Sequence, residues 1–196
     1  MHIYIIIMKM KNNKKTTSLR SVAMKAMSMN DGALGANTIR LESDDPKNYS
    51  GQDLTGQNLS GQDLTGANLS NANLFRTNLT GANLTDADLT NAILSGANLT
   101  DADLTNAILT DANLTHANLT RANLTRATLI GAIFFINADL TGANLTGANL
   151  SNANFFRANL TGANFFRANL TGANFSEAIF LNTICPNGNN TSSGCQ

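Results

Sequence analysis

The side chains that most often carry chemistry in proteins are few and scattered in this sequence. The two histidines, His2 and His116, lie more than half the chain apart. Two pairs of acids, Asp86-x-Asp88 and Asp101-x-Asp103, have a spacing at which carboxylates can cooperate in proton transfer. Threonine hydroxyls are abundant, but they recur at one position of a repeat, as structural residues do. Because no nucleophile is paired with a base, we predict a non-enzymatic protein with no cofactor.

The two cysteines, Cys185 and Cys195, lie near the end of the chain, on either side of a Pro-Asn-Gly turn. Their spacing suits a small disulfide loop, which would indicate an oxidising compartment. Two free thiols in a loose tail are the alternative. Two cysteines with two distant histidines do not form a metal site, so none is predicted.

From Gln52 to Asn182 the chain repeats a five-residue phrase of Ala, Asn or Asp, Leu or Phe, Thr or Ser, and a variable residue. Seventeen phrases are centred on Leu54 through Phe134, and nine more run from Leu140 to Phe180. One extra residue separates the two runs and predicts a bulge near Ile136-Asn137. Residues five apart are rotated by about 140° on a helix, and they alternate sides on a straight strand. The period therefore predicts short extended segments that bend at each junction, so that the chain coils around its own leucines.

This array, with phrases such as Ala97-Asn98-Leu99-Thr100-Asp101, resembles that of the pentapeptide-repeat proteins. The resemblance implies an all-β fold, a right-handed quadrilateral parallel β-helix (a solenoid) with four phrases in each coil. Twenty-six phrases would then make about six and a half coils. Counted on four sides, Asp88 and Asp103 fall on different faces, which indicates solvated surface acids rather than a catalytic pair.

Counting faces also gathers outward-pointing apolar residues on one side. If four phrases make a coil, the phrases centred on residues 54, 74, 94, 114, 134, 155 and 175 share one face. We call the residues beside these centres the apolar strip: Phe75, Arg76, Ile93, Ile133, Phe135, Ile136, Phe156 and Arg157. Adjoining outward apolar residues typically mark an interface. Drift within the repeat, or cover by the N-terminal segment, would also account for them.

Composition divides the chain into three regions. Residues 1–50 form a basic leader, largely disordered or with one short amphipathic helix; residues 51–182 form the β-helix; residues 183–196 form a C-terminal cap and a loose Cys loop. The leader is either retained or an export signal with a cut near Ala33-Leu34-Gly35-Ala36. The localisation is cytoplasmic, or periplasmic or secreted if the leader is a signal and the cysteines are oxidised. No apolar run is long enough for a transmembrane helix.

The repeat holds five basic and nine acidic residues, a mild excess that favours neither a nucleic-acid surface nor a strong mimic of one. We therefore predict a structural scaffold that binds an unidentified protein partner through one face, with no direct nucleic-acid contact. A homodimer through the apolar strip is a further option. The alternative is a DNA mimic that binds DNA gyrase or topoisomerase, as quinolone-resistance members of the resembled family do, although those dimerise through a C-terminal helix that this sequence does not predict. An enzyme built on the repeat is a second alternative.

Overall fold

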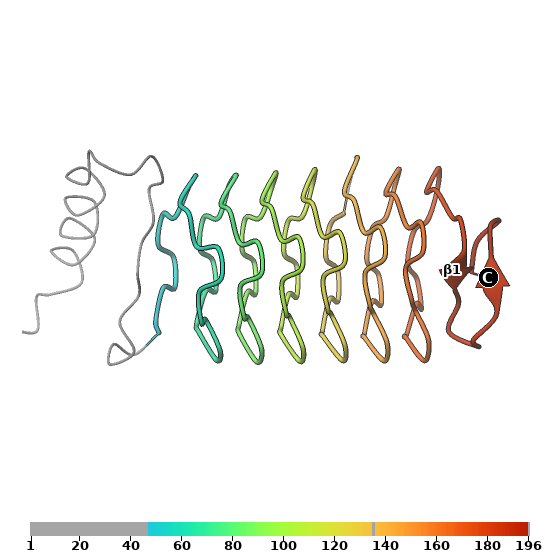
Figure 1. The fold of residues 1–196 in the computed structure, drawn as a ribbon, viewed down its shortest axis with the longest axis horizontal. Coiled ribbons are helices and arrows are strands. Elements are labelled where there is room, and N and C mark those ends of the chain that lie inside the picture. The colour runs from blue at the N-terminus through green and yellow to red at the C-terminus, as the bar shows by residue number, and fades with distance from the viewer. Residues whose placement is uncertain (1–46, 135, 196) are drawn as a thin grey trace, which may run out of the picture. The chain divides into compact units, whose positions relative to one another are not determined.

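The computed structural model describes residues 47–134 and 136–195, and over these residues the chain winds into a right-handed quadrilateral β-helix (Figure 1). Consecutive coils are joined by parallel bridges between residues twenty apart, such as Asn78 with Asn98. Twenty residues and a five-residue phrase give four phrases per coil, so the four-sided architecture is confirmed. The two regular strands, β1 (Thr183–Ile184) and β2 (Asn190–Thr191), lie at the C-terminal end.

Each phrase places its residues in the same way, as the phrase around Leu99 shows. Ala97 and Leu99 are fully buried, while Asn98 between them points outward. The Leu99 N–H donates to Asn118 O in the following coil (2.7 Å), and the Asn98 N–H donates to Thr77 O in the preceding one (2.9 Å). The backbone thus pairs with both neighbouring coils while two apolar residues per phrase enter the core, which is how a five-residue period can be buried.

The remaining positions of the phrase form the corners. The Asn98 carboxamide oxygen accepts bonds from the Thr100 N–H (3.1 Å) and the Thr100 hydroxyl (2.7 Å), which explains why Asn or Asp is followed two residues later by Thr or Ser. The variable residue has a positive φ, for example 62° at Gly81 and 57° at Asp101. Glycine, asparagine and aspartate adopt this conformation most readily, so they are frequent there.

The extra residue lies at one corner, as predicted. Asn113 bridges Ile133 across twenty residues, whereas Asn118 bridges Asp139 across twenty-one. Ile136 and Asn137, at φ of 51° and 60°, together make the turn that elsewhere needs one left-handed residue. The bulge therefore leaves the ladders on all four faces intact.

Two further phrases extend the array beyond its predicted bounds. Asn48 bridges Asn68 and Ile184 bridges Asn164, which places Tyr49 and Cys185 at buried phrase centres. The array therefore contains twenty-eight phrases in seven coils, with seven phrases on each face. Tyr and Cys replace the usual Leu in these phrases, so the repeat pattern missed both.

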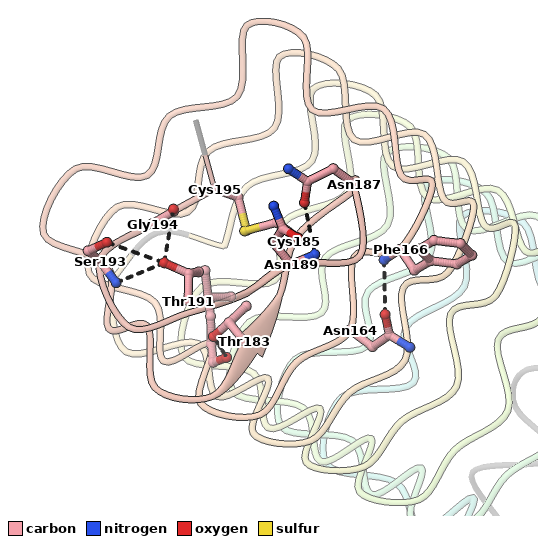
Figure 2. Close-up of a disulfide and its surroundings, with 11 residues drawn as sticks. Asn164, Phe166, Thr183, Cys185, Asn187, Asn189, Thr191, Ser193, Gly194 and Cys195 are labelled. Atoms are coloured by element: carbon pink, nitrogen blue, oxygen red, sulfur yellow. Dashed lines mark hydrogen bonds between the residues drawn. A yellow bond between two sulfur atoms is a disulfide. The ribbon is translucent and has the colours of Figure 1, made fainter.

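The chain after Cys185 is more ordered than the predicted loose loop. β2 pairs antiparallel with β1, with Thr183 opposite Thr191, and the Cys185 N–H donates to Asn189 O at 2.8 Å. Figure 2 shows the loop returning to the end of the coil, where Cys195 is joined to Cys185 by a disulfide. Residues 1–46 of the predicted leader lie outside the described residues, while Asn48 and Tyr49 belong to the first coil.

Candidate interaction face

We name each face of the β-helix by the leucine that its middle coil contributes. Face A carries Leu114, face B Leu119, face C Leu124 and face D Leu109. Seven of the eight residues of the apolar strip lie on face A or on the corner that follows it. The eighth, Phe135, lies outside the described residues.

The side chains of the apolar strip are unusually exposed for their type, but they do not form an unbroken surface. Phe75, Ile93 and Ile133 expose 38%, 43% and 39% of their area, and Phe156 and Ile136 are half-buried. The bridges from Ile93 to Asn113 and from Asn113 to Ile133 place a polar residue between the two isoleucines. The apolar strip therefore consists of two groups, one on each side of the middle coil.

Each group contains a phenylalanine with an arginine stacked on its ring. The guanidinium carbon lies 4.9 Å from the ring centre in the pair Phe75–Arg76 and 4.8 Å in the pair Phe156–Arg157. Such a contact contributes about 0.5–1 kcal/mol at an exposed site. It also holds a flat apolar surface beside a cation, a combination of residues that is enriched at protein interfaces. A third pair, Phe166–Arg167, lies on face C at 4.9 Å.

Ile136 gives this face a strained residue. Its φ of 51° is a left-handed conformation, and among the described residues other than glycine it is the one β-branched side chain that adopts it. The others are Asn, Asp, Arg, His and Glu. Backbone strain of this kind is frequent at functional sites. Sequence reasoning located the bulge but could not show the strain.

The other faces carry fewer exposed apolar side chains. Those on face D are Ile108 and Ile130, that on face C is Phe166, and those on face B are Ile179 and Leu181 beside the C-terminal end. His116 lies on the corner after face A, in the middle coil. Among the described residues no three His, Cys, Asp or Glu side chains come together as metal ligands.

The acids considered for catalysis have structural partners. The Asp88 and Asp103 carboxylates each accept two bonds from the threonine two residues later. Asp101 forms a two-pronged ion pair with Arg121, with both N–O distances at 2.7 Å, and the Arg121 guanidinium lowers the pKa of this carboxyl. Asp88 and Asp103 therefore support the turns of their own phrases, and Asp101 joins two neighbouring coils.

Among the described acids, Asp63 at the N-terminal end of face C has the pKa that departs most from its ordinary value. Hydrogen bonds from the Thr65 hydroxyl and backbone N–H, with the Lys47 ammonium at 3.1 Å, lower the pKa of its carboxyl from 3.8 to about 2. The group lies at the solvent, so this shift reflects local turn geometry and gives no sign of a reactive carboxyl. No helix in the described part of the chain is long and apolar enough to cross a bilayer.

Comparison with known proteins agrees with this architecture. The family described as Pentapeptide repeats (8 copies) matches residues 50–81, 72–111, 82–121, 107–134 and 135–172. No functionally curated protein matches the chain. Among solved structures, HetL of the cyanobacterium Nostoc sp. strain PCC 7120, involved in heterocyst differentiation regulation, is 34% identical over 74% of this chain and 78% of its own, with a TM-score of 0.39.

Two further solved structures are similar to this chain. A pentapeptide-repeat protein of the Arabidopsis thaliana thylakoid lumen is 38% identical over 54% of this chain and 69% of its own, with a TM-score of 0.31. The plasmid-mediated fluoroquinolone resistance protein QnrB1 is 21% identical over 74% of this chain and 66% of its own, with a TM-score of 0.44. With the repeat model covering residues 50–172 and the bridges closing four phrases into each coil, this chain belongs to the pentapeptide-repeat family.

Proposed function

We propose that this chain is a non-catalytic binding rod that docks a protein partner on face A. The observation that carries the proposal is the concentration of exposed apolar side chains on that face, three of which expose more than a third of their area. On faces built from Asn, Asp and Thr, the side chains hydrogen-bond one another. Such faces offer a partner little apolar area that could be removed from water. Phenylalanine and isoleucine beside arginine, in contrast, provide the apolar centre and charged margin of a protein interface.

Support also comes from the repeat itself. Ile93 and Ile133 directly precede a phrase centre, a place that holds Asn in most phrases. Phe75 and Phe156 directly follow a centre, a place that usually holds Thr or Ser, so the fold does not require apolar residues at either place. An apolar residue that the fold does not need, exposed to water, is best explained by contact with another molecule. We assign no catalytic role to the chain and infer no nucleic-acid contact.

The test replaces strip residues by those that the repeat prefers. A double variant, Phe75→Thr with Phe156→Thr, removes the two arginine-stacked rings of face A, while Phe166→Thr on face C makes the same change beside an equivalent arginine. Tagged proteins are used to capture partners from cells of the source organism. The proposal expects a partner that the wild type and Phe166→Thr retain and the double variant loses. Equal capture by all three proteins would contradict it.

Purified gyrase addresses the rival function directly. If the chain binds its partner through face A, we expect that the wild-type chain does not inhibit DNA supercoiling by gyrase at concentrations at which that partner binds. Inhibition that survives the loss of both rings would replace our proposal with the DNA-mimic reading.

A further inference from the structure

The four described apolar residues that flank phrase centres on face A, Phe75, Ile93, Ile133 and Phe156, are arranged symmetrically about the middle coil. Seven phrases stack on this face, and the central one contains Asn113, Leu114 and Thr115. Ile93 lies one coil before it and Ile133 one coil after it, both directly preceding a phrase centre. Phe75 lies two coils before it and Phe156 two coils after it, both directly following a centre. The bulge preserves this order because its extra residue lies at a corner.

Matching residues also have matching local structure. The Phe75 N–H donates to the Asn73 carboxamide at 3.1 Å, and the Phe156 N–H donates to the Asn154 carboxamide at 3.0 Å. Each ring carries the following arginine at nearly the same distance, 4.9 and 4.8 Å. The two Phe–Arg pairs, one on each side of the middle coil, therefore have matching local structure.

From this symmetry we infer that the partner of face A is a second copy of this chain, packed face to face and antiparallel about a two-fold axis through the middle coil. The inference rests on the proposed function and names its partner. A two-fold axis that lies in the interface, perpendicular to the rod, reverses the order of coils but keeps each column of side chains opposite itself. It places Ile93 against Ile133 of the other copy, and Phe75 against Phe156 of the other copy.

The corner column after face A fits the same register. Gly96 comes opposite Ile136 of the other copy, and Gly56 opposite Glu177, so that a residue without a side chain faces a larger one. Arg157 already pairs with Glu177 at 2.7 Å. The register places Arg76, which has no ion pair within the described residues, opposite Arg157 of the other copy. Because Arg157 is paired with Glu177, Arg76 meets an ion pair rather than a lone cation.

A parallel dimer lacks this match. A two-fold axis along the rod keeps the order of coils but exchanges the two columns of side chains. Ile93 would then face Ser95, and Phe75 would face Asn73, so both of these exposed apolar residues would lose water against a polar group. For Ile93 and Phe75, the antiparallel arrangement therefore provides apolar partners and the parallel arrangement provides polar ones.

The size of the face sets the expected strength. Seven coils at about 4.8 Å give a length of roughly 34 Å, and three residues across give a width of about 10 Å. Counted on both copies, such a face buries roughly 700 Å², less than the ~1,200 Å² of stable specific interfaces, so the dimer should be weak and form reversibly with rising concentration. The measurement is sedimentation velocity of the full chain from micromolar to millimolar concentration.

Two substitutions test the contacts, and a third is their control. Ile93→Asn and Ile133→Asn install the residue that the repeat prefers and should each raise the dissociation constant about tenfold or more, because each removes an apolar contact at both symmetry-related places. Ile108→Asn makes the same change at the same phrase position on face D, at a similar exposure of 42%. It should leave the dissociation constant unchanged. An equal effect of Ile108→Asn would overturn the inference.

A charge exchange tests the antiparallel register. Ile93→Lys alone and Ile133→Asp alone should each abolish the dimer by burying an unpaired charge. The double variant should restore it, since each introduced charge then meets its opposite in the other copy. In a parallel dimer the two introduced charges would lie in different coils and would not face each other, so no restoration would follow. Failure of the double variant to exceed the single ones therefore overturns the register.

The inference and the proposed function can fail separately. A wild-type chain that remains monomeric throughout overturns the second copy as partner. If such a monomer still captures a different protein that the Phe75→Thr, Phe156→Thr double variant loses, face A remains the docking face. If the dimer forms but is insensitive to every face A substitution, the inference is refuted, and the capture experiment alone decides the proposed function.

Discussion

Replacement of a single leucine in the middle of the rod should be costly, because each coil depends on its neighbours for cover. Leu119 is fully buried on face B, and the bridges of Asn118 place it between Leu99 and Leu140 in the adjoining coils. The coils are fixed at backbone hydrogen-bond distance, so they cannot close over a missing side chain. Leu119→Ala should therefore leave a cavity and lower the free energy of unfolding by about 2–5 kcal/mol.

Thermal and urea denaturation, followed by circular dichroism, give this value directly. For a chain of this length the loss corresponds to a fall of roughly 4–20 °C in the unfolding midpoint. Leu181→Ala is the matched control, because it makes the same chemical change at a leucine that exposes 50% of its area on the same face. That variant should stay within about 0.5 kcal/mol of the wild type. If Leu119→Ala costs no more than Leu181→Ala, the leucine stack is not the core of the rod.

Three further predictions follow from the corners and the ends. Because the pKa of Asp63 is lowered from 3.8 to about 2, its ionised carboxylate stabilises the fold above pH 3.8, and this contribution is lost as the pH falls to about 2. In thermal melts, the stability difference between the wild type and Asp63→Asn should therefore shrink over that pH interval and stay constant above it. Ile136→Gly removes a left-handed β-branched residue and should be about 1–2 kcal/mol less destabilising than Ile130→Gly at an exposed position with ordinary φ; an equal cost would mean that the bulge stores no strain. The native protein should weigh two hydrogens less before reduction than after it, and Cys195→Ser should lower its stability by up to about 3 kcal/mol; an unchanged mass and melt would show that the bond to Cys185 is not formed.

Much of the rod follows from the sequence because one local rule governs it. A buried Ala and Leu, an outward Asn that bonds the following Thr, and a corner that favours Gly or Asn are all visible within five residues. The number of phrases per coil is different, since any closed number would satisfy the local rule. It came from resemblance, and the twenty-residue bridges supply it independently.

The ends could not be predicted in the same way. Tyr49 and Cys185 are buried at phrase centres although neither phrase follows the pattern, because the preceding or following coil provides the template. Thr183 shows how such a phrase is accommodated. It occupies the Ala position, and its buried hydroxyl donates to Leu160 O at 2.7 Å, as that of Thr77 does to Leu54 O at 2.8 Å.

The sequence predicted which residues lie on the candidate face, but not their exposure or their side-chain conformations. Position within the phrase, together with the four phrases per coil implied by the resemblance, was sufficient to assign Phe75, Ile93, Ile133 and Phe156 to one side. Their exposure, the stacking of Arg76 and Arg157, and the strain at Ile136 depend on side-chain conformation, which the repeat does not encode. The polar residue between the two isoleucines became significant only when the coils could be counted from the middle.

The most direct test of the account is to observe which isoleucines sense a partner. Methyl-labelled isoleucine spectra report on Ile93 and Ile133 of face A together with Ile108 and Ile130 of face D in one sample. The spectra are recorded as the concentration rises and again with the captured partner. We predict that the signals of Ile93 and Ile133 shift and broaden while those of face D stay fixed. Changes confined to Ile108 and Ile130 would contradict the assignment of face A as the binding surface.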